Sequence, residues 1–336
     1  MVISSSNKKN KRMMLLAPNF FGYEKNIQNE IEDLGITVSY FDERPSNSTV
    51  TKGLIRLGLS FAINNKIDAY YRKILLDNFD YLLIINPEAV PFWFIKEFKR
   101  VNPRSQVIIY TWDSFGNKSK NAKYINLVDR FYSFDNHDSS IDSRIIFLPL
   151  FYASDFGEVG KKVTNDYKYN ACFVGTLHSS RYNYVNAVES ELKKHSGKIN
   201  LFKFFYFQSK VVLYLKYLFS NEFSDVPVKD VSFSKLSRNE VVSVISDSRI
   251  VIDLEHKKQK GLTMRTIEAL GAKRKLITTN KEIIHYDFYS EDNILVVDRN
   301  DVNIPHRFLL GNFKEISDDI YTKYSISSWV KKVLEL

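Results

Sequence analysis

The stretch RIVIDLEHKKQKGLTMRTIEALGAKRKLITTNK, residues 249–281, decides the fold. Residues 249–255 form the short apolar run of a buried strand, and a basic loop that ends in glycine follows it. Residues 262–270 have apolar side chains at helical spacing, and Gly271 stands where the helix is expected to end. Residues 275–279 predict a second buried strand. These elements make a βαβ unit, whose loop lies at the carboxyl ends of the strands, where such sheets bind ligands.

The loop and the start of the helix indicate an anionic ligand. Backbone N–H groups and the helix dipole favour phosphate there, and Lys257, Lys258 and Lys260 add positive charge. Arg265 and Glu268 lie three residues apart, so they share one face of the helix. Arginine suits phosphate, and a carboxylate near a helix start can accept hydrogen bonds from ribose hydroxyls. The alternative is a surface ion pair worth about 0.3 kcal/mol.

Four residues of this stretch, Gly261, Arg265, Glu268 and Gly271, together with the strand KLITTN that follows, resemble the donor-binding half of GT-B glycosyltransferases. The resemblance covers residues 239–299 and is to the group-1-like enzymes of bacterial capsule, lipopolysaccharide and spore-coat glycosylation. It implies that Glu268 holds the ribose of a nucleotide sugar. Retaining group-1 enzymes carry a further glutamate eight positions earlier, where this chain has Lys260, so inversion or retention at the anomeric carbon stays open.

The resemblance also implies which residues bind the donor. A strand at residues 173–177 runs into a small-residue turn, where Gly175 and Thr176 would let the backbone approach the donor and Arg181 would bind its diphosphate. A strand that ends in Gly-Thr is also common in other α/β folds. The residues expected on the donor side are Gly175, Thr176, Arg181, His256, Lys260, Gly261, Thr263, Arg265 and Glu268.

Alternating apolar strands and helical segments along the rest of the chain favour a doubly wound parallel sheet. We therefore predict an α/β protein of the GT-B type, in which two Rossmann-like domains with parallel sheets face a central cleft. Residues 1–152 are expected to form the acceptor domain, residues 153–168 a polar linker and residues 169–315 the nucleotide-sugar donor domain. Residues 316–336 predict a final helix, which the resemblance implies packs back on the N-terminal domain.

Three polar residues follow neighbouring strands of the first domain: Asp113, His137 and Asp138. A carboxylate or histidine there would face the cleft and could take a proton from an acceptor hydroxyl. The alternatives are an aspartate that caps the next turn and a histidine with a structural role.

Aromatic residues suggest two further contacts. Phe20, Phe21 and Gly22 follow the first strand and would line the acceptor side by stacking on sugar rings, unless they belong to the core. Residues 201–219, LFKFFYFQSKVVLYLKYLF, combine aromatic and aliphatic side chains with three lysines. This mixture is typical of an interfacial helix and predicts peripheral membrane contact. The alternative is a strand and a helix buried in the second domain.

Composition narrows the class of protein. At 336 residues the chain is long enough for two domains with separate cores. Its one cysteine, Cys172, excludes an internal disulfide framework and fits a reducing compartment, and no zinc pattern is present. The net charge of +9 is spread over both halves, so no nucleic-acid partner is expected. A diffuse basic surface suits an anionic membrane or ligand, and also a mildly basic protein without either.

The amino terminus predicts the cellular location. Its basic residues precede an apolar run of only residues 13–17, which is too short for a signal-peptide core. No run of about 18 uncharged apolar residues exists, so a membrane-spanning helix is not expected. We expect a cytoplasmic protein, with peripheral contact at the inner face of the cell membrane.

The sequence therefore predicts a glycosyltransferase, hexosyl- or related, that moves a sugar from a nucleotide sugar to a surface glycan. The acceptor would be a capsule, lipopolysaccharide or exopolysaccharide chain, free or lipid-linked. No Asp-x-Asp motif lies near a strand end, so transfer is expected to need no metal and no cofactor. The alternatives are a transferase for another phosphorylated donor and a non-catalytic scaffold that binds nucleotides.

Overall fold

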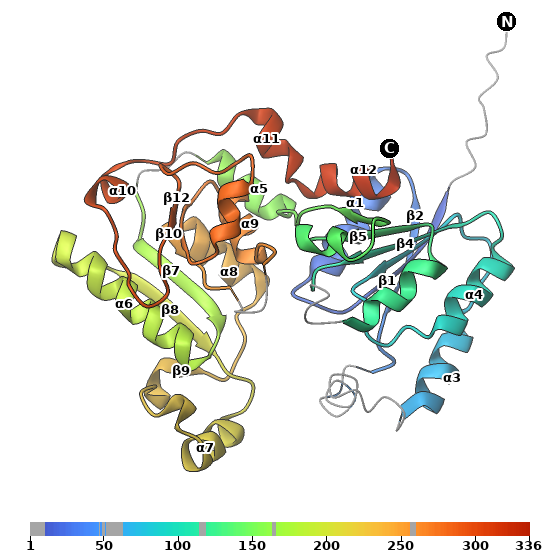
Figure 1. Ribbon diagram of the computed structural model, residues 1–336, viewed down its shortest axis with the longest axis horizontal. Coiled ribbons are helices and arrows are strands. Elements are labelled where there is room, and N and C mark those ends of the chain that lie inside the picture. The colour runs from blue at the N-terminus through green and yellow to red at the C-terminus, as the bar shows by residue number, and fades with distance from the viewer. Residues whose placement is uncertain are drawn as a thin grey trace, which may run out of the picture. The chain divides into compact units, whose positions relative to one another are not determined.

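The computed structural model describes residues 11–46, 48, 51, 63–113, 119–162, 166–255 and 260–336 (Figure 1). The chain divides into two compact units. The first consists of residues 1–149 and 326–336, and the second of residues 150–325. Each unit contains one six-stranded sheet, in which all neighbouring strands are parallel.

The sheet of the first unit has the strand order β2-β1-β3-β4-β5-β6. Its strands are β1 (Arg12–Ala17), β2 (Thr37–Asp42), β3 (Tyr81–Ile85), β4 (Gln106–Thr111), β5 (Arg130–Ser133) and β6 (Ile145–Phe147). The strand β3 is buried along its whole length, and β1 and β4 are buried except at their first residues. Helices cover both faces of a parallel sheet, and this is why these strands are apolar at every position rather than at alternate ones.

The helices of the first unit are α1 (Tyr23–Asp33), α3 (Asn64–Ile74), α4 (Phe92–Val101) and α12 (Ile326–Leu334), with 3₁₀ segments η2 (Ser119–Leu127) and η3 (Asn136–Ser140). The helix α12 comes from the far end of the chain. Its Trp329 packs edge-on against Tyr110 of β4, with ring centroids 4.8 Å apart. Arg130 of β5 pairs with Glu335 at 2.7 Å and also donates to the Val333 carbonyl. These contacts make α12 part of the first unit.

The sheet of the second unit has the strand order β12-β11-β10-β7-β8-β9. Its strands are β7 (Tyr169–Thr176), β8 (Leu201–Tyr206), β9 (Val231–Ser232), β10 (Ser248–Ile252), β11 (Lys275–Thr278) and β12 (Ile294–Val296). Counted from β7, this is the doubly wound order 3-2-1-4-5-6. The point where the order reverses lies between β7 and β10, so their carboxyl ends flank the ligand-binding position of such a sheet.

The helices of the second unit are α5 (Ser154–Lys161), α6 (Ser179–Ser196), α7 (Lys210–Phe219), α8 (Arg238–Ser246), α9 (Met264–Gly271), α10 (His306–Leu310) and α11 (Asp318–Lys323). Three 3₁₀ segments complete it: η4 (Asn221–Phe223), η5 (Val228–Asp230) and η6 (Lys281–His285). The predicted βαβ unit at residues 249–281 is confirmed as β10, α9 and β11.

The structure differs from the sequence prediction at two segments. Residues 154–161, expected within a polar linker, form the helix α5. Its neighbouring residues are polar, but Phe156 and Val159, three positions apart, are buried on one side of the helix and stabilise it. The single helix expected over residues 316–336 is two helices. The backbone N–H of Tyr152 donates to the Tyr324 carbonyl at 2.9 Å, and this pairing interrupts the helix between α11 and α12.

Gly271 is the last residue of α9, but a left-handed backbone is not the reason for a glycine there. Lys273, two residues later, has the positive φ of 52°. A Cβ added to Gly271 would lie 2.5 Å from the ring of Tyr152, so the glycine allows this tyrosine to pack directly on the helix. Close packing therefore explains the glycine that the sequence assigned to helix termination.

Candidate active site

The carboxyl end of β10 is fixed to the start of α9 by a buried aspartate. Asp253 is 5% exposed and accepts hydrogen bonds from the hydroxyls of Thr263 at 2.9 Å and Thr266 at 3.1 Å. Thr263 also accepts from the Thr266 backbone N–H and so caps the helix. Burial raises the pKa of Asp253, while both threonines and the charge of Arg181 oppose the rise. The strand end and the helix start are therefore one rigid element.

Arg181 and Arg299 surround this element with positive charge. Arg181 donates to the carbonyl of Thr176 at 3.1 Å and to that of Leu254 at 3.2 Å, so it joins the ends of β7 and β10. Burial lowers the pKa of Arg181, and the neighbouring carboxylates counteract this effect. Arg299 donates to the Glu255 carboxylate at 2.7 Å and to its carbonyl at 3.0 Å. The carboxyl edge thus holds arginines that are already positioned by the protein.

Arg265 and Glu268 form an ion pair at 2.5 Å on α9. The side chains are 18% and 8% exposed, so this is not the solvated surface pair that spacing alone permits. The Nε of Arg265 is buried and has no hydrogen-bond partner among the described residues. Glu268 is therefore nearly buried, and one of its two carboxylate oxygens already accepts a hydrogen bond from Arg265.

The remaining donor-side residues are placed as follows. Lys260 is exposed, Gly261 is buried, and the carbonyls of both accept from the Asn280 side chain at 3.2 and 3.3 Å. Thr176 is exposed at the end of β7. A Cβ added to Gly175 would lie 2.8 Å from the Phe173 ring, so ring packing already requires this glycine.

His256, with Lys257 and Lys258, lies outside the described residues. Sequence reasoning did not select Asp253, Glu255, Thr266 or Arg299. The signal for the first two was available, because both carboxylates lie at the carboxyl end of the strand predicted over residues 249–255. Arg299 gave no local signal, because it reaches Glu255 across 44 positions of the chain.

Asp113 follows β4 in the first unit, where its carboxylate accepts a hydrogen bond from the Asn86 side chain at 3.0 Å. Asn86 follows β3, is 3% exposed and has a left-handed backbone with φ of 50°. Asp113 is partly exposed. Its position beside a rigid, buried amide is compatible with a group that accepts a proton from a bound hydroxyl.

The other two predicted catalytic residues are placed differently from each other. His137 is exposed, and its backbone N–H donates to Asp135 at 3.1 Å. Asp138 is 3% exposed and accepts from the Ser133 hydroxyl at 2.5 Å. The structure therefore presents Asp113 and His137 to solvent but places Asp138 in the interior.

Two phenylalanines at the end of β1 lie on the surface. Phe20 is 40% and Phe21 is 49% exposed, so they are not core residues. The ring of Phe20 lies 4.8 Å from that of Phe21 and 5.7 Å from that of Trp112, measured between centroids. Phe21 and Gly22 both have positive φ, 53° and 77°, and make the turn into α1. The result is an exposed aromatic surface at the carboxyl edge of the first sheet.

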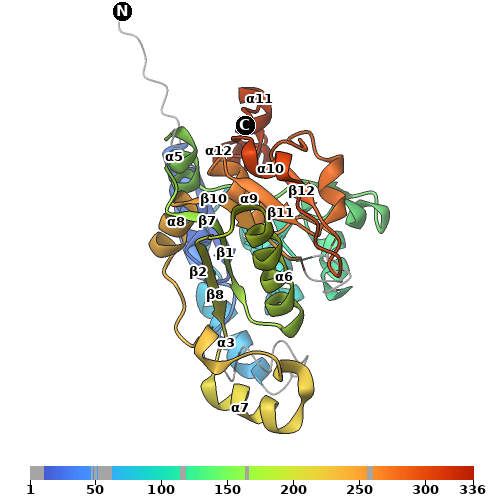
Figure 2. The ribbon, with the colours of Figure 1, turned by 90° about the vertical axis from the view of Figure 1, so that its left-hand side faces the viewer.

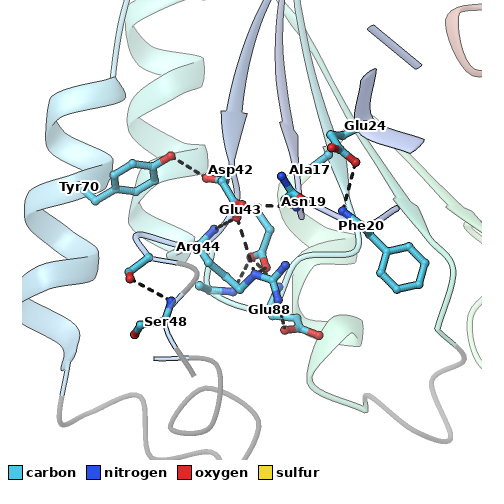
Figure 3. Close-up of polar contacts among 12 residues, drawn as sticks. Ala17, Asn19, Phe20, Glu24, Asp42, Glu43, Arg44, Ser48, Tyr70 and Glu88 are labelled. Atoms are coloured by element: carbon cyan, nitrogen blue, oxygen red, sulfur yellow. Dashed lines mark hydrogen bonds and ion pairs between the residues drawn. The ribbon is translucent and has the colours of Figure 1, made fainter. Parts of the chain in front are cut away.

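A buried glutamate at the same edge was missed from the sequence. Glu43 directly follows β2, is completely buried, and accepts from the backbone N–H groups of Glu88 at 3.1 Å and Ala89 at 2.9 Å (Figure 3). Arg44 lies 3.3 Å away. Burial raises the pKa of Glu43 to about 7, although these hydrogen bonds and Arg44 oppose the rise. Glu43 thus connects the loops that follow β2 and β3.

Among the described residues, no group of three or more His, Cys, Asp or Glu side chains is arranged to hold a metal ion. In the same part of the chain, no helix is long and apolar enough to cross a membrane.

Comparison with solved structures identifies the fold. The chain is similar to an α-glucosyltransferase in complex with UDP and a DNA 13-mer, at 13% identity and a TM-score of 0.55, over 96% of this chain and 94% of the other. It is similar to an α,α-trehalose-phosphate synthase from Burkholderia xenovorans in complex with glucose-6-phosphate, at 9% identity and a TM-score of 0.56, over 97% and 99%. It is also similar to a UDP-GlcNAc 2-epimerase from Methanocaldococcus jannaschii in complex with UDP-GlcNAc and UDP, at 10% identity and a TM-score of 0.53, over 96% and 99%.

No protein-family model and no curated protein sequence matches the chain. The similarity to these solved structures extends over nearly the whole length, and two sheets of six parallel strands with flanking helices are what they share with this chain. The predicted GT-B fold with two Rossmann-like domains is therefore confirmed.

Proposed function

We propose that the protein is a glycosyltransferase that uses a nucleotide sugar as its donor. The observation that carries this proposal is the carboxyl edge of the second sheet. Buried Asp253 fixes the start of α9 there, and Arg181, Arg265 and Arg299 surround it. Helix N–H groups and arginines suit a diphosphate. Similar folds occur in proteins whose structures contain UDP or UDP-GlcNAc, which supports the same choice of donor.

In the proposed reaction, a hydroxyl oxygen of the acceptor forms a bond to the anomeric carbon of the donor sugar. The bond from that carbon to the diphosphate breaks, and the nucleoside diphosphate leaves with the electron pair. Asp113 takes the hydroxyl proton, and His137 is the competing candidate for this role. Arginine and lysine side chains with helix N–H groups stabilise the departing diphosphate, so the proposed transfer is independent of metal ions.

The proposed role of Glu268 is to accept hydrogen bonds from the ribose. Arg265 already binds one oxygen of the Glu268 carboxylate, so the ribose would bind the other oxygen or displace the arginine. A phosphate group that binds Arg265 would supply a new partner for the arginine as the pair opens. In that case, the ion pair of Arg265 with Glu268 would be replaced by two contacts, one between Arg265 and the phosphate and one between Glu268 and the ribose.

The proposed acceptor is a surface glycan of the capsule, lipopolysaccharide or exopolysaccharide type, free or lipid-linked. This part of the proposal is supported by the resemblance of residues 239–299 to group-1-like enzymes. An exposed aromatic surface at Phe20 and Phe21 suits stacking on a sugar ring. Since lipid-linked acceptors lie in a membrane, we also propose that the protein works in contact with the membrane surface.

A second candidate function is epimerisation of a nucleotide sugar. The observation in its favour is the similarity to the UDP-GlcNAc 2-epimerase, which extends over 96% of this chain. An epimerase would change the donor sugar without an acceptor and would not release nucleoside diphosphate in proportion to a glycosylated product.

The test is incubation of the full-length protein with a panel of UDP-, GDP- and ADP-sugars, with and without glycan acceptors, in buffer that contains EDTA. Transfer predicts nucleoside diphosphate and glycosylated acceptor in equal amounts. Isomerised donor without any acceptor would support the epimerase instead. Loss of all activity in EDTA, with recovery on addition of Mg²⁺, would contradict metal independence.

A further inference from the structure

The helix α7 turns its apolar side outward. Of the large apolar side chains on this helix, Leu213 is completely buried, whereas Leu218 is 75% and Phe219 is 84% exposed. The exposed large apolar side chains of α7 are Val211, Val212, Tyr214, Leu215, Leu218 and Phe219. Isolated exposed apolar residues are normal on a protein surface. Six within a ten-residue helix form an apolar patch, and such patches mark sites of interaction with a protein or a membrane.

The spacing of these residues gives the patch one direction. At about 100° per residue, Val211, Leu215 and Leu218 lie at the centre of the face opposite Leu213. In the same helical projection, Lys210 and Lys216 lie at the two edges of this face. We call the side chains of Val211, Val212, Tyr214, Leu215, Leu218 and Phe219 the outward face of α7.

Contacts with the rest of the second unit fix the orientation of α7. The hydroxyl of Ser209 caps its first turn, Leu213 packs into the core of the second unit, and the Tyr217 hydroxyl donates to the Val226 carbonyl at 2.5 Å. Figures 1 and 2 both place α7 at the tip of the second unit, away from the helices α6, α8 and α9. The outward face therefore stays exposed while the helix is anchored from behind.

The structure also shows which part of residues 201–219, the segment predicted to contact a membrane, exposes apolar side chains. Residues 201–206 of that segment are the strand β8, which pairs with β7 and β9 inside the sheet. The large apolar side chains of this segment that are exposed all belong to α7.

We propose that the outward face of α7 inserts into the interfacial layer of an anionic membrane. Lysines on both sides of an apolar face are the arrangement that binds to such a surface, with the apolar side chains at the boundary of headgroups and acyl chains. Lys210 has no ion pair among the described residues, and Lys216 retains partial exposure in its pair with Glu222 at 2.7 Å. The inference deepens the membrane contact of the proposed function by assigning the element and the lipid charge.

A second copy of this chain fits the outward face less well. A ten-residue helix is about 15 Å long. Stable protein interfaces bury roughly 800 Å² on each partner, which is more than one face of such a helix provides. The lysines at both edges would also meet each other across a two-fold symmetric contact.

The experiment is flotation of the full-length protein with vesicles of phosphatidylcholine alone and of phosphatidylcholine mixed with phosphatidylglycerol. We expect flotation with the mixed vesicles. In the double variant Leu218→Ser, Phe219→Ser the bound fraction should fall by roughly tenfold or more, because two inserted side chains are lost. Lys210→Gln should weaken binding to the mixed vesicles by about fivefold and leave binding to neutral vesicles unchanged.

The matched control is Leu310→Ser, because Leu310 is 68% exposed on α10 of the same unit. It should float as the unaltered protein does. The proposal is overturned if the unaltered protein does not float, or if the double variant floats equally well. Sedimentation velocity provides a third outcome: a dimer that the double variant abolishes would assign the outward face to a second copy.

Calorimetric titration of the same variants with nucleotide sugars separates this inference from the proposed function. The double variant should bind the donor as the unaltered protein does, since α7 is not part of the donor site. A protein that floats but binds no nucleotide sugar would retain the membrane assignment and lose the proposed function. The reverse result would retain the function and remove the assignment.

Discussion

The carboxyl edges of the two sheets differ in charge although both sheets are parallel and doubly wound. In the described part of the second unit, Arg181, Arg265 and Arg299 lie among three carboxylates, those of Asp253, Glu255 and Glu268. Among the residues that the structure describes at the corresponding edge of the first unit, carboxylates outnumber cations, and Arg44 lies in their midst. These carboxylates are Asp42, Glu43, Glu88, Asp113, Asp135 and Asp138.

In the proposed reaction, this difference fits the two similar sheets to two different substrates. A diphosphate suits an edge where arginines are held by carboxylates that it can replace. An edge with many carboxylates repels phosphate and suits a neutral hydroxyl, whose proton a carboxylate can accept. The exposed rings of Phe20 and Phe21 add a surface for an uncharged sugar.

The largest effect is expected when the proposed proton acceptor of the first unit, Asp113, is removed. Asp113→Asn keeps the shape and the contact with Asn86 but abolishes the base, so kcat should fall by about 10²–10⁴-fold. The donor Kd should not change, because the proposed donor site is in the second unit. Transfer rates and calorimetric titration measure the two quantities.

Asp33→Asn serves as the control, because Asp33 is exposed at the end of α1 in the same unit. It should leave kcat unaltered. Full activity in Asp113→Asn combined with a large loss in His137→Gln would transfer the role of base to His137.

Glu43 predicts a pH dependence of stability that is confined to the first unit. Its pKa is raised to about 7 in the folded protein from 4.5 in the unfolded chain, so the folded state binds the proton more tightly. This stabilisation is complete below pH 4.5, decreases as pH rises and is lost above about 7. The free energy of unfolding should therefore fall by about 3 kcal/mol across this range, and by less in Glu43→Gln.

The three tryptophans, Trp93, Trp112 and Trp329, all belong to the first unit, so their fluorescence in urea titrations reports its unfolding. Unfolding should be followed at pH 5 and pH 8 in both proteins. An equal pH dependence in the variant and in the unaltered protein would show that another group is responsible.

The smallest of the three effects is an increase in the donor Kd, expected on substitution at the carboxyl edge of the second sheet. Glu268→Ala removes the proposed ribose acceptor, and a hydrogen bond to a charged group is worth about 1.5–3 kcal/mol, so donor Kd should rise about tenfold or more. Calorimetric titration with the active nucleotide sugar measures it. Glu268→Gln, which retains the shape, separates loss of recognition from loss of folding.

Glu291→Ala is the matched control, because Glu291 also pairs with an arginine, Arg307, but on the surface, where the side chains are 76% and 82% exposed. It should leave donor affinity unchanged. A change of less than about twofold in Glu268→Ala would remove the ribose role, since a lost charged hydrogen bond costs more.

Local patterns predicted the parts of the site that depend on neighbouring residues. The helix at residues 262–270 and the shared helix face of Arg265 and Glu268 follow from helical spacing, whereas the cap by Thr263 was not predicted. Whether that pair was exposed or buried did not follow, because burial depends on what packs against the helix. The same limit applied to Glu43, whose partners in the loop after β3 lie 45 and 46 positions away.

The sequence by itself determined the βαβ unit, the two-domain α/β class and the strands that are apolar throughout, because a strand buried on both faces must be apolar and a helix must follow the period of 3.6 residues. The strand β9 was not predicted, and β8 was only an alternative to an interfacial helix. Tertiary structure alone decided which arginines gather at the carboxyl edge of the second sheet. It also decided that residue 271 must be glycine, because Tyr152 packs against it. It also decided that the apolar side of α7 faces outward. Apolar spacing predicts that a helix has an apolar face, but the direction of that face depends on contacts with residues far away in the chain.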